Sequence, residues 1–346
     1  MIVLGIETSC DESSASLVRD GTQMLSNIVA SQVDLHARYG GVVPEIAARA
    51  HVEAMAPVVE EALRPLGGKP DAVAVTAGPG LVGSLIVGVC AAKALAWAWD
   101  VPLVAVNHVE AHAFAPLLEG MPLEYPFLAL LVSGGHTLLA RVESFESIEV
   151  IGQTLDDALG EAYDKVAKFL GLGYPGGPVI DRLSKEGNER AVRFPRAMMG
   201  SGDHNFSMSG LKTAVIRHIE ADAAQGKRHT DADLSASFQA AALEVVVTKT
   251  VNAALELGLS RVVAGGGVAC NSELRSRLER ECEENGLGLT LASPGLCTDN
   301  AAMVAALGYL RYKGGYRSGL DLDVYPKLSP GQPIPGETKD RKGATG

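Results

Sequence analysis

The sequence predicts an α/β protein built from two similar halves. Each half opens with two β-rich segments around a polar or glycine-rich turn. These are "IVLGIET" and "SASLVRDG" around "SCDES", and later "FLALLV" and "LLARV" around "SGGHT". Helical and strand patterns then alternate in both halves, which is typical of α/β folds. We therefore expect a duplicated α/β domain with a cleft between the copies.

In the first half, the pattern predicts a long helix over "PEIAARAHVEAMAPVVEEAL", which "GGKP" ends. A buried strand "DAVAVTAG" and an apolar helix follow, and the strand "VPLVAV" leads to Asn107. Asn107 is a favourable N-cap with Glu110 at the N3 position, which together predict a capping box. The helix that begins there should end or kink at Pro116.

In the second half, "TLDDALGEAYDKVAKFLG" predicts a helix with Asp157, Glu161 and Asp164 on one face. Such a face is either simply solvated or turned toward a ribose. "RVVAGGG" reads as a strand, and "NSELRSRLERECEE" as an amphipathic helix capped by Asn or Ser. We expect domains over residues 1–122 and 123–299, with about 300–326 packing back on the first. The polar, Pro- and Gly-rich tail 329–346 is predicted to be disordered.

The composition is that of a globular protein, with 47% hydrophobic and 21% charged residues in 346. The net charge of −11 argues against a broad nucleic-acid-binding surface, because such surfaces are basic. A nucleic-acid partner must therefore meet a local basic patch or be held with help from another subunit. The most basic segment contains Arg193, Arg196, Lys212 and Arg217, which could meet phosphates or a partner protein.

The five cysteines form no C-x-x-C pair, which predicts reduced thiols in the cytoplasm. The N-terminus lacks a basic segment ahead of a long apolar run, so no signal peptide is expected. The longest apolar stretch, "GSLIVGVCAAKALAWAW", contains Lys93 and is followed by Asp100. We interpret it as a buried helix rather than a membrane span, and expect no membrane partner.

The stretch "NHVEAH" places His108 and His112 four residues apart, so that both imidazoles leave the same face of a helix. Glu110 does not occupy the position that the zinc-protease pattern H-E-x-x-H requires, so that chemistry is disfavoured. Asp299 in "CTDNAAM" offers a third ligand at a loop-to-helix junction. Two histidines and a carboxylate suit iron(II) and can suit zinc. Two histidines with purely structural roles would show the same spacing.

Several glycine loops follow strands. "GPGLVG" matches G-x-G-x-x-G, but the acidic residue of a dinucleotide site is absent at Asn107, so close helix packing is favoured. "SGG" at 133–135 is either an anion-binding nest or a plain hairpin turn. "YPGGP" is a tight turn with Asp181 nearby, and "AGGGVACN" suits an adenine or ribose. There Asn271 could cap a helix, bind a nucleotide, or do both.

Together these pieces resemble one family, the tRNA N6-adenosine threonylcarbamoyltransferases, formerly called glycoproteases. The matching stretches run in family order from residue 5 to about residue 303. They are "GIETSCDES", "YGGVVPEIAARAH", "NHVEAH", "LLVSGGHT", "DDALGEAYDKVAK", "YPGGP", "FSMSGLKT", "AGGGVACN" and "CTDNAAM".

The resemblance implies a two-domain actin- and Hsp70-like fold with a central nucleotide cleft. It implies transfer of a threonylcarbamoyl group from threonylcarbamoyl-adenylate to N6 of the adenosine 3′ of the anticodon, in tRNAs that read codons beginning with A, with release of AMP. It implies that His108, His112 and Asp299 hold one divalent metal, usually iron(II), with zinc or magnesium possible in a crystal. The implied substrate-binding residues are Leu131, Val132, Ser133, Gly134, Gly135, Asp164, Gly177, Asp181 and Asn271.

The resemblance also implies tRNA as a partner, together with a paralogous subunit and a small ATPase. The residues identify no catalytic base. Cys10 has no evident activating group, and Asp11 could orient the attacking amine or merely shape its turn. Two other interpretations remain open: an ATP-hydrolysing kinase or chaperone-type ATPase of the same fold, and a non-catalytic nucleotide-binding scaffold.

Overall fold

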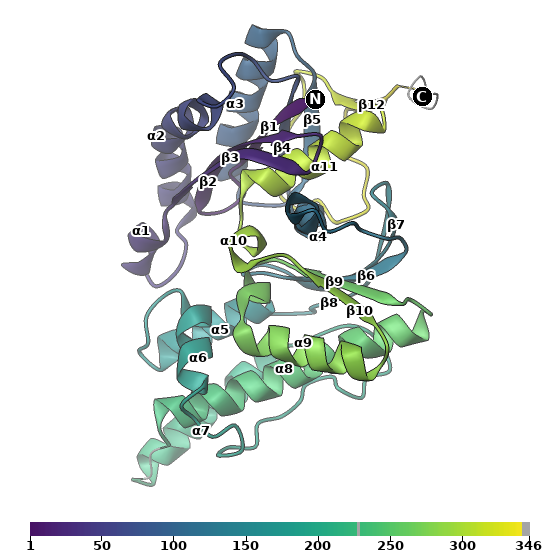
Figure 1. Cartoon of the computed structure of the whole chain (residues 1–346). Helices are drawn as coiled ribbons and strands as arrows, with labels where there is room; N and C mark the ends of the chain where they lie inside the picture. The colour runs from purple at the N-terminus through teal and green to yellow at the C-terminus, as the bar shows by residue number, and fades with distance from the viewer. Residues whose placement is uncertain (227–228, 341–346) are drawn as a thin grey trace. The chain divides into compact units, whose positions relative to one another are not determined.

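The computed structural model describes residues 1–226 and 229–340, which form two compact units (Figure 1). Unit 1 comprises Met1–Tyr125, Glu143–Ile148 and the residues from Gly295 onward. Unit 2 comprises Pro126–Val142 and Glu149–Pro294. Each unit is an α/β structure around one mixed sheet, as the alternation of patterns predicts.

Unit 1 is built on a sheet of strand order β12-β11-β5-β4-β1-β2-β3 within the described residues. Its strands are β1 (Ile2–Glu7), β2 (Glu12–Arg19), β3 (Gln23–Ser31), β4 (Ala72–Gly78), β5 (Leu103–Asn107), β11 (Tyr316–Ser318) and β12 (Glu337–Lys339). Strands β1, β4 and β5 are parallel, so that their carboxyl ends meet at one edge. In open α/β sheets that edge is where ligands are usually bound.

Helices cover both faces of this sheet. On one face, α2 (Pro44–Leu63) packs on β2 and α3 (Val82–Trp99) packs on β4. Alternate residues of β1 point to that side, where Leu4 and Ile6 join a fully buried cluster with Val89 of α3. On the other face lies α11 (Ala301–Lys313), which crosses β1 and β4 (Figure 1). The remaining helices are α1 (Val33–Ala37), α4 (His108–Phe114), the 3-10 helix η1 (Ala115–Glu119) and α10 (Pro294–Cys297).

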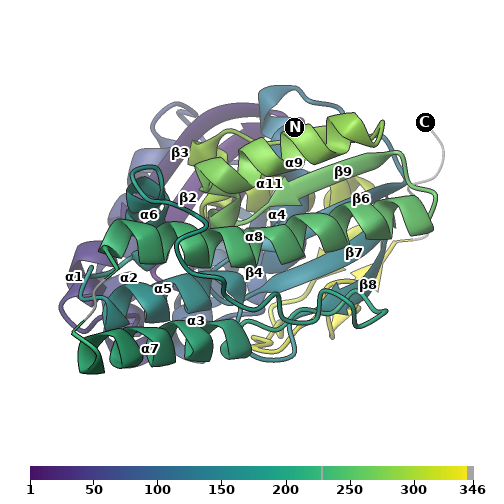
Figure 2. The same ribbon diagram turned by 90° about the horizontal axis from the view of Figure 1, so that it is seen from below.

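Unit 2 is built on a sheet of strand order β10-β9-β6-β7-β8 within the described residues. Its strands are β6 (Phe127–Val132), β7 (Thr137–Ser144), β8 (Ser147–Gln153), β9 (Arg261–Gly265) and β10 (Gly288–Leu291). Figure 2 shows α8 and α9 lying side by side against this sheet, where α8 contacts β6 and α9 contacts β10. The helices are α5 (Leu159–Phe169), α6 (Gly176–Ser184), α7 (Ser209–Ala224), α8 (Asp231–Glu256), the 3-10 helix η2 (Gly267–Cys270) and α9 (Ser272–Glu284).

The structure corrects two sequence-based expectations. Helix α5 begins at Leu159, so Asp157 precedes it and does not share a helical face with Glu161 and Asp164. The reason is a turn in which the Thr154 hydroxyl donates to the Asp157 carbonyl. The tail is also not disordered over its whole predicted length, because β12 pairs with β11 and Ile334 is buried. Residues 341–346 of that predicted tail lie outside the described residues.

The apolar stretch near Lys93 forms α3, the one helix in the described part of the chain that is long and apolar enough to cross a membrane. One face of α3 is buried against unit 1 through residues such as Leu85 and Val89, whereas Trp97 is 74% exposed. The expected buried helix is therefore buried on one side only. That one-sided packing is what a helix lying on a sheet of a globular unit shows.

Candidate metal centre and substrate-binding residues

The histidine pair lies at the beginning of α4, directly after β5. Asn107 ends the strand and caps the helix, since its side chain accepts hydrogen bonds from the amides of Val109 and Glu110. The predicted cap is thus confirmed, and the helix ends before Pro116. His108 and His112 lie one turn apart and are 6% and 2% exposed. The strand end and the cap fix both imidazoles at the carboxyl edge of the sheet.

Asp299 reaches the same edge from the other end of the sequence. It directly precedes Asn300, which caps α11 by accepting from the amide of Met303. Helix α11 approaches β1 closely because Gly5 has no side chain. A Cβ at Gly5 would lie 2.1 Å from the carbonyl oxygen of Ala301. The glycine therefore lets the beginning of α11, and with it Asp299, rest on the end of β1.

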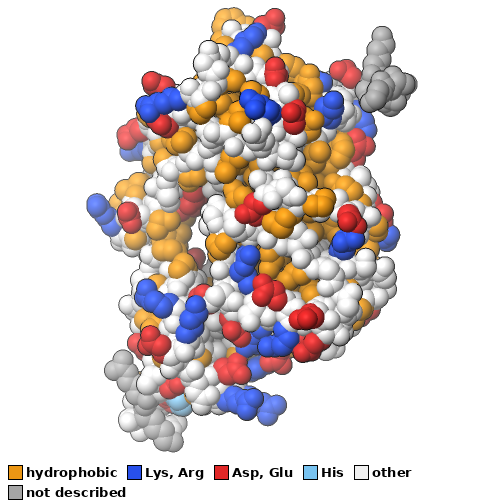
Figure 3. All heavy atoms as spheres, viewed as in Figure 1, with side chains coloured by type: hydrophobic (Ala, Val, Ile, Leu, Met, Phe, Trp, Pro, Cys, Tyr) orange, Lys and Arg blue, Asp and Glu red, His pale blue; other side chains and the backbone are white. Residues whose placement is uncertain are grey.

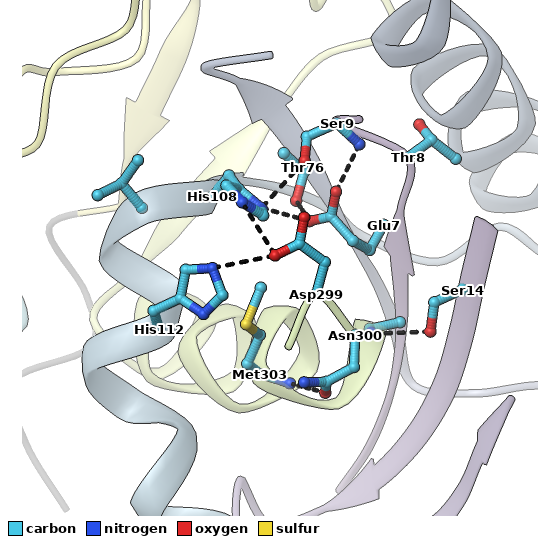
Figure 4. A network of polar contacts seen from close by, with 12 residues as sticks. Glu7, Thr8, Ser9, Ser14, Thr76, His108, His112, Asp299, Asn300 and Met303 are labelled. Atoms are coloured by element: carbon cyan, nitrogen blue, oxygen red, sulfur yellow. Dashed lines mark hydrogen bonds and ion pairs between the residues drawn. The ribbon is translucent and has the colours of Figure 1, made fainter. Parts of the chain in front are cut away.

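The three predicted metal-ligating residues come together in unit 1 (Figure 4). Oδ1 of Asp299 lies 3.2 Å from Nε2 of His112 and 3.6 Å from Nε2 of His108. Ligand atoms around a tetrahedral ion with bonds of about 2.0–2.1 Å are about 3.3 Å apart. These two separations are close to that value, so the group could hold a metal ion.

Glu7 contacts this group although its sequence position gave no prediction for it. Its Oε2 accepts a 2.9 Å hydrogen bond from Nδ1 of His108, and the Thr76 hydroxyl donates to the same oxygen at 2.6 Å. Its Oε1 accepts from the amide of Ser9 at 2.5 Å. A carboxylate that binds one ring nitrogen of a histidine orients the other nitrogen for a metal. The available signal was an acid at the end of a buried strand in "GIETSCDES".

The electrostatics of this group favour a cation. Burial opposes the charged form of His108, but Glu7 and Asp299 outweigh it and raise the pKa of His108 to about 9. Burial likewise opposes ionisation of Glu7, yet the charge of His108 and its hydrogen bond lower the Glu7 pKa. Burial, Asp299 and Asp11 raise the pKa of Glu12 to about 10. The carboxylates of Glu7, Asp11, Glu12 and Asp299 are thus close enough to affect one another, and a nearby cation would reduce their repulsion.

The side chain of His112 shows whether the site has room and need for a metal ion. Neither of its ring nitrogens has a hydrogen-bond partner among the described residues, although both are buried. The 3.2 Å approach of Nε2 to Asp299 does not have hydrogen-bond geometry. A buried polar atom without a partner costs about 1–3 kcal/mol. A cation between Nε2 and Oδ1 of Asp299 would remove that cost, so the residues present fit a divalent metal.

Glu110 lies on α4 but faces away from the two imidazoles, as its position in the helix predicts. The predicted capping box is wrong, because its Oε1 accepts from the amide of Gly331 at 2.7 Å rather than reaching back to Asn107. Burial raises the pKa of Glu110 to about 7, although the Gly331 amide and Arg311 oppose that rise. The residue joins α4 to the C-terminal segment and is no metal ligand.

In unit 2, the predicted residues 131–135 and Asn271 lie in the segments that end and follow the parallel strands β6 and β9. Leu131 and Val132 are the last residues of β6, and Ser133 begins a hairpin turn. The amide of Ser133 donates a hydrogen bond to the carbonyl of His136. Among the described residues, the amides of Gly134 and Gly135 make no hydrogen bond. The segment is therefore a hairpin that also presents two adjacent amide donors, as an anion nest does.

Gly266 fixes the second loop of this group, after β9. It has φ of +94°, and a Cβ there would lie 2.3 Å from the carbonyl oxygen of Val132. Only glycine accepts both the left-handed backbone and this close approach. The loop "AGGGVACN" is thereby held against the end of β6, and it leads to Asn271, which caps α9 by accepting from the amide of Leu274.

The two acids predicted to hold adenosine have structural partners. Asp164 accepts from the amide of Gly176 at 2.7 Å, directly before Gly177 in α6. Asp181 accepts from the amide and the hydroxyl of Ser272, the residue after Asn271. Asp181 also lines a cavity of about 230 Å³. The structure therefore joins α5 to α6 and α6 to α9 through the residues that the sequence analysis selected.

Cys10 lies near the end of β1 but is a poor candidate nucleophile. Burial, then the negative charges of Asp11 and Asp299, raise its pKa well above the ordinary value for a thiol. The thiolate is the nucleophilic form, so this thiol stays inactive at neutral pH. Cys10, Cys90, Cys270, Cys282 and Cys297 form no disulfide among the described residues, and the reduced state stays a prediction.

Comparisons with known proteins agree with this picture. The family model described as tRNA N6-adenosine threonylcarbamoyltransferase matches residues 23–306. The protein of that name from Geotalea uraniireducens is 52% identical to this chain, over 94% of this chain and 96% of its own length. The one from Bacillus subtilis is 51% identical, over 95% of this chain and 95% of its own length. A solved structure of HypF from T. kodakarensis covers 90% of the chain with a TM-score of 0.61, at 16% identity and over 48% of its own length.

The likeness to HypF concerns the fold alone, and together with the two mixed sheets it agrees with the predicted α/β class. The activity is indicated by the curated relatives. They are identical to this chain at about half of the positions over nearly its whole length, and all have the same name. The chain belongs to the tRNA N6-adenosine threonylcarbamoyltransferases, the acyltransferases of threonylcarbamoyladenosine synthesis.

Proposed function

We propose that this chain transfers the threonylcarbamoyl group of L-threonylcarbamoyl-adenylate to N6 of the adenosine 3′ of the anticodon, in tRNAs that read codons beginning with A. The observation that carries this proposal is its identity of about one half, over 94–97% of the chain, with relatives named for that transfer. The N6 amine attacks the carbamoyl carbon, the bond from that carbon to the phosphate oxygen breaks, and AMP leaves with the bonding electrons while the amine loses a proton.

We further propose that His108, His112 and Asp299 hold one divalent metal, iron(II) in the cell. The unpartnered imidazole of His112 and the separations of 3.2 and 3.6 Å support this assignment. When bound, such an ion acts as a Lewis acid toward carbonyl or phosphoryl oxygens. Glu7 keeps the proton of His108 on Nδ1 and so keeps Nε2 available as a ligand.

The substrate-binding residues remain a proposal for unit 2. Leu131 to Gly135 would line the substrate, and the amides of Gly134 and Gly135 would donate to a developing negative charge. Asp164, Gly177, Asp181 and Asn271 would hold the adenosine part. A Cβ at Gly177 would meet nothing within 4 Å, so a ligand can approach the backbone there.

We propose that tRNA binding is shared with other proteins in the cytoplasm. The net charge is −11, and on the face shown in Figure 3 acidic and basic side chains are interspersed. Affinity for nucleic acid comes mainly from concentrated positive charge. A paralogous subunit and a small ATPase would therefore complete the active assembly.

The decisive experiment incubates the chain with threonylcarbamoyl-adenylate and unmodified tRNA, with and without partner subunits from a bacterial relative. The tRNA is then digested and the nucleosides are identified by mass. We expect threonylcarbamoyladenosine and a matching amount of AMP. In a parallel incubation with ATP, phosphate release without the modified nucleoside would favour the ATPase alternative. Full activity of His108→Ala would favour a non-catalytic scaffold and would contradict the metal assignment.

A pair of glycines tests the adenosine residues. Gly177 and Gly210 are each the second residue of a helix, and a Cβ at either would meet nothing within 4 Å. We expect Gly177→Leu to raise KM for the adenylate at least about tenfold, because the side chain would occupy the space of the ligand. Gly210→Leu should leave that KM unchanged. Equal effects of the two substitutions would contradict the placement of adenosine beside Gly177.

A further inference from the structure

A second group of metal-ligating side chains lies in unit 2, where α7 ends and α8 begins. His218 and Asp222 are one turn apart on α7, and His229 directly precedes Thr230, the N-cap of α8. Nε2 of His218, Oδ2 of Asp222 and Nδ1 of His229 converge on one point. The side chains are 27%, 13% and 32% exposed, so the group is half-buried and open to water on one side.

The three separations suit a metal ion. His218 Nε2 lies 3.2 Å from His229 Nδ1 and 3.5 Å from Asp222 Oδ2, and the third separation, His229 Nδ1 to Asp222 Oδ2, is 2.5 Å. Tetrahedral zinc sites place ligand atoms about 3.3 Å apart. A circle through the three atoms has a radius of about 1.8 Å, so a point about 1 Å above their plane lies about 2.05 Å from each, which is a zinc bond length.

The arrangement favours a positive charge. A carboxylate and two imidazole nitrogens each direct a lone pair inward unless a proton occupies one of them. Without an ion, His229 forms a strong hydrogen bond with Asp222, whereas Nε2 of His218 lies 3.5 Å from the same oxygen without hydrogen-bond geometry. The same nitrogen of His218 lies 3.2 Å from Nδ1 of His229, so that two ring nitrogens and a carboxylate oxygen face one another. A divalent ion would satisfy all three atoms at once.

We propose that His218, Asp222 and His229 bind one divalent cation of the zinc class, with water in the fourth position. The ion would fasten the last turn of α7 to the beginning of α8. The opposite end of α7 is already fastened, since Asp156 accepts from the amides of Met208 and Ser209. The site is separate from the His108 group and does not rest on the proposed transfer reaction.

The test uses the full chain carrying His108→Ala and His112→Ala, so that the first metal group is removed. The protein is stripped with a chelator and titrated with Co²⁺, whose visible ligand-field bands report binding by imidazole and carboxylate. We expect one equivalent to bind. Adding His229→Ala or His218→Ala should weaken binding by at least about 100-fold, because only two ligands remain.

The matched control is His204→Ala, because His204 is also in unit 2 but lies near a single carboxylate, that of Glu256 at 3.6 Å. This change should leave Co²⁺ binding intact. Should the doubly substituted chain fail to fold, as judged by circular dichroism, metal content is counted in the otherwise native protein. Two equivalents of Zn²⁺ that fall to one in His229→Ala support the site. One equivalent in both proteins, or binding that His229→Ala does not change, overturns it.

Discussion

Replacing Glu7 with glutamine tests how the fold prepares the metal group. Glutamine has nearly the same shape, but one of its two terminal atoms is a donor instead of an acceptor. In the native structure both oxygens of Glu7 accept, from Ser9, Thr76 and His108. The amide group of glutamine must therefore face at least one existing donor, whichever way it is turned.

Both orientations carry a cost. If the amide nitrogen faces His108, Nδ1 must become the acceptor, and the proton moves to Nε2, the atom that faces Asp299. That nitrogen then lacks the lone pair that a metal needs. If the amide nitrogen instead faces Ser9, the side-chain N–H of the glutamine points at the backbone N–H of Ser9. Two buried donors then lack an acceptor, which lowers the free energy of unfolding by about 1–3 kcal/mol. Loss of such an outer partner weakens metal binding by about 10–100-fold, or about 1.4–2.7 kcal/mol.

The assay measures Fe²⁺ or Zn²⁺ affinity by competition with a chromogenic chelator at pH 7.5. The matched control is Glu110→Gln, which changes another buried acid close to the imidazoles but leaves the bond to Nδ1 of His108 intact. We expect weaker binding only in Glu7→Gln. If Glu7→Gln binds the metal as tightly as the native chain does, or if both substitutions weaken binding equally, then Glu7 does not position His108.

Two further predictions concern unit 2. Asp157 accepts from Lys165 at 2.8 Å and from Lys212 at 2.6 Å; burial opposes its ionisation, but these lysines prevail and lower its pKa. A lowered pKa contributes stability above the ordinary value of about 3.8, which is lost as the pH falls below it. Asp157→Asn should thus reduce the free energy of unfolding by about 1 kcal/mol at pH 7, and by less and less as the pH falls from 3.8 through the lowered pKa of Asp157, as urea titrations would reveal. Gly266→Ala should cost at least about 2 kcal/mol, visible as a lower Tm, because the added Cβ meets the carbonyl of Val132 at positive φ; an unchanged Tm would show that the loop can move away.

The sequence predicted best those elements whose bounds depend on residues close together in the chain. The helix from Pro44 to Leu63 has the predicted bounds, and Asn107 caps α4, because periodicity and capping chemistry act over a few residues. The position of Asp299 beside the histidines could be predicted only through the family resemblance. The physical cause, the approach of α11 to Gly5, involves residues about 300 positions apart.

The expectations that the structure corrects share one cause, which is competition from distant partners. The start of α5 gives way to a turn because Thr137 accepts the amide of Leu159 and Thr154 bonds to Asp157. The tail is ordered up to β12 despite its composition because the buried Arg311 pairs with Glu337 at 2.6 Å. Composition predicts whether a segment can form its own core, but it does not show whether a core formed elsewhere offers a partner.

The metal group depends on several parts of unit 1 because α4 is a short helix. A helix of seven residues is too short to be stable alone, so α4 must be held by its surroundings. Asn107 fixes its beginning, Glu7 holds one imidazole, and Glu110 ties its opposite face to Gly331. The C-terminal segment thus supports the face of α4 that carries no ligand. With the helix held in this way, Nε2 of each imidazole faces Asp299.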